Sequence, residues 1–422
     1  MGDSALLVGA NVIATIATSL VAVVVARGLD PGGWALFSAL LGLALGVGFI
    51  VDFGLSTWLL RELTRVDTGR RADREGDTAR LLSNGLACNV GLTVLVVGVA
   101  APIAVLLGAS SEELLVLGLF VLYIGMLAAA GACEARLRAV RRVGVVSSAM
   151  LVEKAVLLAS LLLVATTSEL TVVAAAAAYP LAGATRLCIA GWAAWRGLHP
   201  VLPTLGAVRH VAVSSLPFAL SAGALNLVPR LDTLVVIGAS ATSAAYIALG
   251  ERILGPALFI PVVLSATLYP FVAEARSQRT MWRLTAAVGT VGALVAALAV
   301  VVAPFAVPLV FGEPYRDAVG TVQVLMLTLP FVYASNVLLT FLYSAGLERR
   351  VLVSTLAVAV AGTAAILVGQ MLGGAELAAA GSVVRQACFL AVLVAIGRRV
   401  VSSPRGAARD PMTTETVEGV TS

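Results

Sequence analysis

The sequence is poor in charged residues and contains almost no lysine. Only 12% of the 422 residues are charged, and 27 of the 28 basic residues are arginine, which leaves Lys154 as the single lysine. By contrast, 60% of the residues are hydrophobic and the mean hydropathy is +1.01. Because soluble domains average about 25% charged residues, this composition excludes a soluble protein and indicates a polytopic membrane protein.

The residues that usually carry catalysis or bind metals are also scarce. Both histidines, His199 and His210, fall on or beside one predicted loop, and the four cysteines lie in apolar segments without CxxC spacing. Neither a P-loop nor a GxGxxG motif is present. We therefore expect no enzyme activity, no cofactor and no metal site. The net charge of +5 follows from the loop charges described below, so nucleic-acid binding is not expected.

Long apolar runs between charge clusters predict the transmembrane segments. A helix needs about 20 apolar residues to cross the hydrocarbon core of a bilayer. By this criterion the fold class is all-α, with twelve transmembrane helices at residues 4–26, 33–58, 81–107, 112–134, 145–167, 170–192, 211–238, 244–271, 285–309, 318–342, 351–370 and 377–397.

The loop arginines predict the orientation, since short cytoplasmic loops collect basic residues. They cluster after the second and fourth segments, at Arg61, Arg65, Arg70, Arg71, Arg74 and Arg80 and at Arg136, Arg138, Arg141 and Arg142. Both termini are then cytoplasmic. The first apolar run is long and lacks a basic start, so we expect a retained helix. The arginine bias is typical of a GC-rich bacterial genome, and we expect a multi-pass protein of the bacterial cytoplasmic (inner) membrane.

A proline-containing link at 193–210 divides the chain into two halves of six segments each. "RRVGVVSS" at 141–148 and "RRVLVST" at 349–355 each follow an even-numbered segment. These echoes indicate parallel repeats flanking a central path. We therefore expect a six-helix lobe at 1–197, a second at 198–400, and a disordered cytoplasmic tail at 401–422.

Ionisable residues inside the predicted segments are the candidates for function. An arginine or lysine at bilayer depth costs about 2.5 to 3.5 kcal/mol on insertion scales, so it must face protein or water. Mutual pairing is one explanation, although basic residues exceed acidic ones. The other is a hydrated, cationic cleft, in which we place Arg27, Lys154, Arg252 and Arg385 as substrate-binding candidates and Glu251 as a coupling or orienting residue.

The seventh segment contains the unusual stretch "LNLVPRLDTLVV" at 225–236. Arg230 and Asp232 are two residues apart, diverge by about 200° on a helix and cannot share one face. Asn226 and Arg230 lie close to one polar stripe, which makes both of them candidates for the cleft. Pro217 and Pro229 predict a bent or broken helix, as transporters use near binding sites.

Several motifs carry a family resemblance. These are "LPFALSAGALNLVPRLDTLVV" at 216–236, "VDFGLSTWLLREL" at 51–63, "LVFGEPYRDAV" at 309–319 and "AYIALGERILGPALFIPVVLSATLYPFVAEA" at 245–275. Their order and spacing resemble the polysaccharide-biosynthesis flippases of the Wzx type, in the MATE/MurJ-like (MOP) superfamily.

The resemblance implies two six-helix lobes in a V around a central cavity. It also implies alternating-access flipping of a polyprenyl-pyrophosphate-linked saccharide for cell-surface polysaccharide biosynthesis. Motif positions carry Arg61 and Arg230 over as pyrophosphate-binding residues, with Asp52 and Asp232 as coupling or orienting residues. Expected partners are the lipid-linked cargo, membrane lipid, a coupling ion (H+ or Na+), and the polymerase and glycosyltransferases of the pathway.

Two alternatives share features with this interpretation. A MATE-type cation-coupled multidrug exporter has the same fold, but it is expected to carry an acidic cavity. A twelve-span symporter of the major facilitator type fits the segment count, but its Gly-x-x-x-Asp-Arg pattern is missing from the loop at 61–80.

Overall fold

A computed structural model describes residues 2–68, 74–106, 108–227, 236–274, 278–344 and 347–401. These ranges contain helices joined by short loops, and no strand occurs in them. The helices are α1 (Gly2–Gly28), α2 (Pro31–Asp52), α3 (Leu55–Thr68), α4 (Arg74–Leu106), α5 (Ser111–Ala139), α6 (Val143–Thr167), α7 (Val172–Trp195), α8 (Leu205–Leu227), α10 (Ala241–Glu274), α11 (Gln278–Phe311), the 3-10 helix η2 (Glu313–Ala318), α12 (Val319–Met326), α13 (Leu329–Ser344) and α14 (Glu348–Val401).

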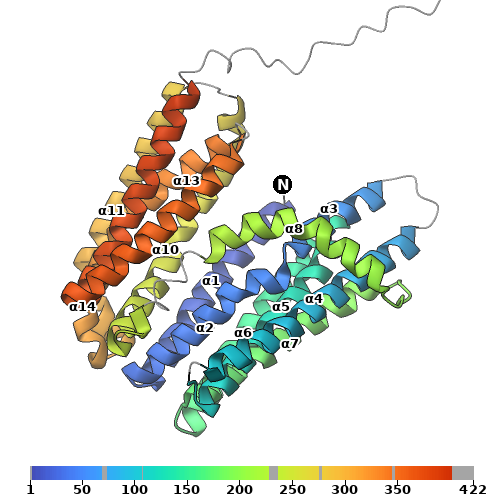
Figure 1. Cartoon of the computed structure of the whole chain (residues 1–422), viewed down its shortest axis with the longest axis horizontal. Helices are drawn as coiled ribbons and strands as arrows, with labels where there is room; N and C mark the ends of the chain where they lie inside the picture. Colours follow the sequence, from blue (N-terminus) through green and yellow to red (C-terminus); the bar gives the residue numbers. More distant parts are fainter. Residues whose placement is uncertain are drawn as a thin grey trace, which may run out of the picture.

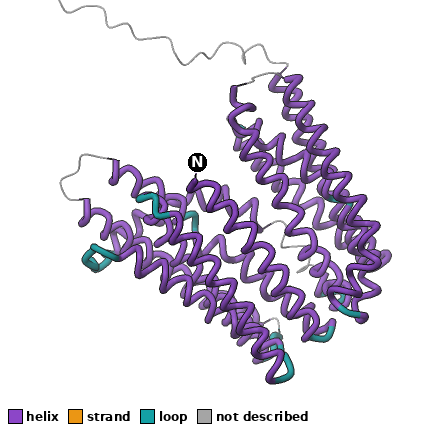
Figure 2. Tube along the Cα trace, turned by 180° about the vertical axis from the view of Figure 1, so that it is seen from behind, coloured by secondary structure: helices purple, strands orange, loops and turns teal. Residues whose placement is uncertain are grey.

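The helices form two bundles that diverge from one another (Figures 1 and 2). The first bundle contains α1 to α7, and the second contains α10 to α14. Helix α8 packs on α2, α3 and α4 and also contacts α14. We call the end where the bundles meet the closed end, and the end where α1 begins and α14 finishes the open end.

The buried apolar side chains explain this shape. The largest cluster joins both bundles, with Trp34 of α2, Leu249 of α10 and Tyr315 of η2 all at most 1% exposed. Toward the open end the clusters separate, one around Leu137 in the first bundle and another around Leu338 in the second. Burial of apolar surface therefore holds the bundles together at the closed end and leaves the open end free to split.

Glycines with positive φ angles lie at two breaks, one between α2 and α3 and one within α14. Between α2 and α3, Phe53 and Gly54 have φ angles of 48° and 66°, which end α2 at Asp52. Helix α14 breaks at Gly373 and Gly374, where Gly374 has a φ of 70°. Glycine adopts this left-handed conformation without a steric penalty. The second break lies between the predicted segments 351–370 and 377–397.

Nine helical stretches of the described residues are long and apolar enough to cross a membrane. They are Gly9–Gly28, Pro31–Thr64, Glu75–Leu106, Ser111–Ala139, Val143–Thr167, Val172–Trp195, Met281–Phe311, Glu313–Leu342 and Val353–Arg398. The last stretch contains the α14 break, and the predicted segments 211–238 and 244–271 are not among the nine.

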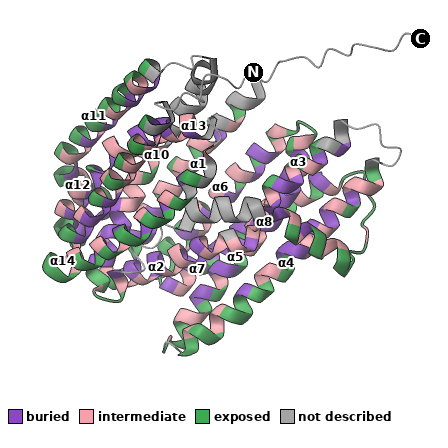
Figure 3. Ribbon diagram, turned by 45° about the horizontal axis from the view of Figure 1, so that its top comes forward, coloured by how far each residue is buried: buried purple, intermediate pink, exposed green. Residues whose placement is uncertain are grey.

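The outer surface of the bundles is apolar. On α11, Phe305 is 77% exposed and Leu298 66% exposed, and exposed positions follow the outer helices in Figure 3. Large apolar side chains facing outward in such numbers match a hydrocarbon solvent. The structure is thus an all-helical polytopic membrane protein, and the total of twelve spans stays a prediction.

Candidate functional site

A cavity of about 550 Å³ lies between the two bundles. Helices α1 and α2 line it on one side, and α10, α12, α13 and α14 line it on the other. Its polar and charged lining residues are Thr15, Thr18, Ser19, Ser38, Glu251, Arg252, Thr328, Ser335, Asn336, Ser382, Arg385 and Gln386. A cavity of this size is typical of a small-molecule or headgroup site.

Among the described residues, those that line the cavity and carry a charge all belong to the second bundle. Glu251 and Arg252 are neighbours on α10, and Arg385 lies on α14. Arg252 has no hydrogen bond or ion pair within the described part of the chain. Arg385 is 7% exposed, and its aliphatic stem lies directly over Gly362 of the preceding half of α14. A side chain at position 362 would displace Arg385, so this glycine is required for the arginine to reach the cavity.

The first bundle contributes hydroxyl groups instead of charges. Thr15 and Thr18 donate their hydroxyl hydrogens to the backbone carbonyls one turn earlier, over 2.8 Å in each case. Their oxygens therefore stay available as hydrogen-bond acceptors toward the cavity. Ser38 of α2 and Ser335 of α13 have buried hydroxyl oxygens without a partner among the described residues. Such groups are suited to a ligand rich in hydroxyls.

The predicted site residues divide by location. The structure brings Arg252, Arg385 and Glu251 together at the cavity. Arg230 and Asp232 lie outside the described residues, as does the side chain of Asn226. Arg27, Arg61, Lys154 and Asp52 are placed elsewhere.

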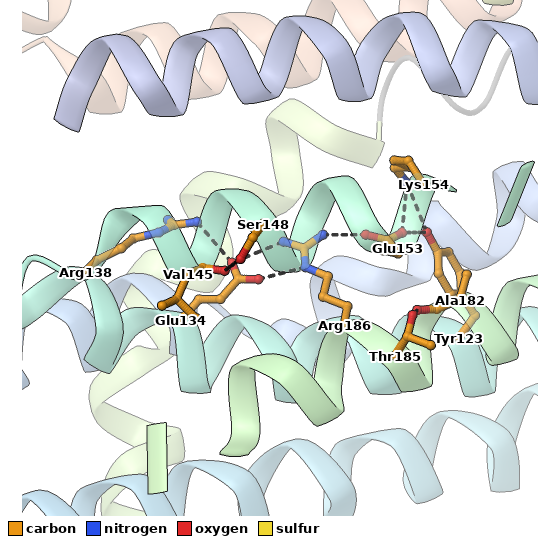
Figure 4. Close-up of polar contacts among 10 residues, drawn as sticks. All are labelled: Tyr123, Glu134, Arg138, Val145, Ser148, Glu153, Lys154, Ala182, Thr185 and Arg186. Atoms are coloured by element: carbon orange, nitrogen blue, oxygen red, sulfur yellow. Dashed lines mark hydrogen bonds and ion pairs between the residues drawn. The ribbon is translucent and has the colours of Figure 1, made fainter. Parts of the chain in front are cut away.

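Lys154 belongs to a buried polar network that links α5, α6 and α7 (Figure 4). Glu153 accepts hydrogen bonds from Lys154 and from the Tyr123 hydroxyl, both over 2.8 Å. Arg186 donates one hydrogen bond to Glu153 over 2.9 Å and another to Glu134 over 2.7 Å, so it connects the two carboxylates.

In this charge network, defined as Tyr123, Glu134, Arg138, Glu153, Lys154 and Arg186, both carboxylates are at most 1% exposed. Because both carboxylates are fully paired, the network holds three helices together and leaves little of Lys154 for substrate.

Arg27 lies at the closed end, where it ties the two bundles together. Its Nε donates to the carbonyl of Val310 over 2.7 Å, and its Nη2 donates to Leu309. Tyr315 donates its hydroxyl to Ala26 over 3.1 Å, and Trp34 donates its indole N–H to Ala245 over 3.3 Å. We call these three donors, Arg27, Trp34 and Tyr315, the inter-bundle latch.

Asp52 and Arg61 lie around the break between α2 and α3. Asp52 accepts the hydroxyl of Ser56 over 2.5 Å and the backbone N–H groups of Gly54 and Ser56, so the carboxylate caps the start of α3. Arg61 is 53% exposed, and its Nε lies 4.0 Å from Glu62. The Asp-x-Gly motif thus has a local role, because Gly54 supplies the positive φ of the break and Asp52 satisfies the following turn.

The position of a basic residue within its apolar segment does not tell whether its side chain lies in the cavity, in the charge network or in the inter-bundle latch. Arg27, Lys154 and Arg252 all looked alike as basic residues near or within apolar segments. Ser38 and Ser335, which line the cavity, carry no distinguishing pattern in an apolar chain rich in small residues. The sequence does not show that Gly362 is needed for the cavity, because this follows only from its contact with Arg385.

Comparisons with known proteins agree with this architecture. A family model described as "Polysaccharide biosynthesis protein" matches residues 2–276. A comparison with curated protein sequences gives no match.

Among solved structures, the chain is similar to the lipid II flippase MurJ in an inward closed conformation. The identity is 12% and the TM-score 0.73, over 93% of this chain and 87% of that chain. A MATE family multidrug resistance transporter of the MOP superfamily matches in its inward-facing conformation, with 16% identity and a TM-score of 0.70 over 94% and 96% of the chains. The outward-facing form gives 17% identity and a TM-score of 0.61, with 95% of each chain covered. At these identities the likeness shows the fold.

Proposed function

Because the chain belongs to the polysaccharide biosynthesis protein family, we propose that it moves a polyprenyl-pyrophosphate-linked saccharide from the cytoplasmic to the outer leaflet by alternating access. The chain is a transporter of this flippase family and not an enzyme. The observation that carries the finer proposal is the asymmetric cavity, with cations on the second bundle and hydroxyl oxygens on the first.

Arg252 and Arg385 bind the pyrophosphate in this proposal. A diphosphate entering apolar surroundings needs charge compensation, and arginine supplies a permanent charge with planar paired donors. Glu251, beside Arg252, orients the guanidinium groups and is the candidate for ion coupling by H+ or Na+. Arg230, Asp232 and Asn226 stay candidates for the same cleft, on the basis of the sequence alone.

The saccharide faces the first bundle. Sugar hydroxyls are hydrogen-bond donors, and the oxygens of Thr15 and Thr18 are acceptors whose own hydrogens are already used. The lipid tail stays in the bilayer, between the diverging bundles. Specificity for one glycan then depends on small polar residues of α1, α2 and α13.

The direction of opening supports a cytoplasm-facing state. The open end carries the starts of α1 and α4 and the end of α3, and the arginines of α3 and of the start of α4 predict a cytoplasmic location. The likeness to the inward-facing MATE transporter, at a TM-score of 0.70 against 0.61 for the outward-facing one, points the same way. The proposal therefore includes twelve spans, lobes at 1–197 and 198–400, cytoplasmic termini with a tail at 401–422, and residence in a bacterial inner membrane.

Membrane potential favours this transport. Moving one negative charge outward across an inside-negative membrane is favourable by about 2.3 kcal/mol per 100 mV. Glycosyltransferases that build the cargo and the polymerase that consumes it are the partners that this direction of transport requires.

A flipping assay in proteoliposomes tests the function. A fluorescent polyprenyl-pyrophosphate saccharide is reconstituted with the protein, and its transfer between leaflets is followed by quenching from one side. Loss of one charge-assisted contact costs about 1.5 to 3 kcal/mol, so Arg252→Gln and Arg385→Gln should each slow flipping about ten- to a hundredfold. Arg283→Gln, which removes an exposed arginine of α11 outside the cavity, should flip at the wild-type rate. Equal rates in all four proteins would overturn the proposed site.

A further inference from the structure

A second pocket lies at the open end of the first bundle and shares no lining residue with the central cavity. It has a volume of about 140 Å³ and forms where α3 and α5 end and α4 begins. Its lining residues are Leu63, Val66, Glu75, Thr78, Arg136, Ala139, Val140 and Leu198. We call it the Arg136 pocket.

Arg136 is unusual among the arginines near the pocket. Its Nε and Nη1 atoms are buried and have no hydrogen-bond partner among the described residues. By contrast, Arg138, two residues later on α5, is hydrogen-bonded to Glu134. A buried charged donor without an acceptor is costly, and native structures normally supply a partner from protein, water or ligand. The pocket in front of Arg136 is the place for such a partner.

The pocket carries charges of both signs. Glu75 of α4 lines it together with Arg136, and the Thr78 side chain lies one turn further along α4. Among the described residues, Arg142 is the other charged group that acts electrostatically on Arg136, and it adds positive charge near Arg136. A simple anion would be attracted by Arg136 and repelled by Glu75. A ligand with a phosphate next to an ammonium group satisfies both.

The position of the pocket indicates where such a ligand comes from. The pocket lies where α5 passes into the arginine-rich turn at 138–142, which is the depth of lipid headgroups if α5 spans the bilayer. Leu63, Val66 and Ala139 supply apolar walls beside the charged groups. We propose that the Arg136 pocket binds the phosphoethanolamine headgroup of a membrane phospholipid, with its phosphate on Arg136 and its ammonium group on Glu75.

Occupation of the pocket links three helices through one ligand. The phosphate contacts the end of α5, the ammonium group contacts the start of α4, and the walls belong to α3 and α5. The bound lipid therefore acts as a brace at the open end of the first bundle, independently of the transported cargo and of the central cavity.

Lipid retention by the purified full-length protein tests this inference. Native mass spectrometry of detergent-solubilised protein is recorded with added phosphatidylethanolamine and, separately, with phosphatidylglycerol. The wild type should bind phosphatidylethanolamine more tightly. Arg136→Gln should weaken that binding about tenfold, in line with the loss of a charged hydrogen bond. Arg80→Gln, which removes an exposed arginine from the same end of α4, should bind like the wild type.

A second variant tests the role of the acidic wall. Glu75→Gln should remove the preference for phosphatidylethanolamine over phosphatidylglycerol while retaining lipid binding. Soluble phosphoethanolamine should compete only weakly, because it lacks the glycerol and acyl parts. The inference is overturned if Arg136→Gln retains both lipids at wild-type affinity, if Glu75→Gln leaves the preference unchanged, or if inorganic phosphate displaces the lipid completely.

Discussion

The inter-bundle latch gives the most specific mechanical prediction. If transport proceeds by alternating access, the contacts between bundles at the closed end must break when the cavity opens to that side. Tyr315 is the best latch residue to perturb, since it is 1% exposed and its hydroxyl donates to Ala26 across the two bundles. Tyr315→Phe removes this hydrogen bond and keeps the aromatic ring.

The size of the effect follows from the contact. A neutral hydrogen bond contributes about 1 kcal/mol net, and every 1.4 kcal/mol changes an equilibrium constant about tenfold. Tyr315→Phe should therefore raise the ratio of open to closed states at this end about fivefold. Arg27→Gln should act in the same direction, and the two effects need not add because Ala26 and Arg27 are neighbours.

Distances between spin labels measure this ratio. Labels at Glu169→Cys, between α6 and α7, and at Met371→Cys, beside the α14 break, report on opposite bundles at the closed end in a variant without native cysteines. The long-distance population should grow in Tyr315→Phe. A matched control is Tyr333→Phe, which removes a partly buried hydrogen bond of 2.7 Å from the tyrosine hydroxyl to the Ala257 carbonyl within the second bundle. Unchanged distances in Tyr315→Phe, or an equal change in the control, would refute the latch.

Three further predictions concern the charge network, the cavity and the driving force. Arg186→Met should destabilise the folded protein by about 3 to 5 kcal/mol, since it removes the cation that two buried carboxylates share and leaves Glu134 with the partly exposed Arg138. Adding Glu134→Gln should recover part of this loss in thermal unfolding, and no recovery would contradict the pairing. Gly362→Leu should slow flipping in a folded protein about as much as Arg385→Gln does, by displacing Arg385. Gly191→Leu, at a position with open space around it, should flip normally, and equal rates would contradict the packing argument. An inside-negative potential imposed on proteoliposomes should accelerate outward flipping and an inside-positive one should slow it, whereas insensitivity would exclude net movement of negative charge.

The sequence predicted the membrane environment and the all-helical fold, because both depend on properties summed over long segments. Long apolar segments identify helices in lipid, whichever neighbours they acquire. The pair Gly373 and Gly374 separates two predicted segments, and the structure breaks α14 there. The structure shows that Asp52 of the Asp-x-Gly motif accepts hydrogen bonds from Ser56 at the start of α3, and its role in coupling or orienting stays a prediction.

The location of individual charges depends on helix rotation and on partners far away in sequence. Arg252 and Arg385 are 133 positions apart, and only tertiary packing brings them to one cavity. Lys154 has the same apolar surroundings in the sequence, but Glu153 and Tyr123 engage it within the first bundle. The hydrogen-bond acceptors of Arg27 lie on α11, 283 positions later in the sequence for Val310. None of these pairings follows from depth in the membrane.

The central claim is that the cavity between the bundles holds the pyrophosphate of a lipid-linked saccharide. Photocrosslinking tests it most directly, with a polyprenyl-pyrophosphate saccharide that carries a diazirine next to the diphosphate. We expect crosslinked peptides from α10 and α14 around Arg252 and Arg385, with loss of labelling when unlabelled substrate is added. Labelling confined to other helices, or labelling that substrate does not displace, would contradict the assignment of the cavity.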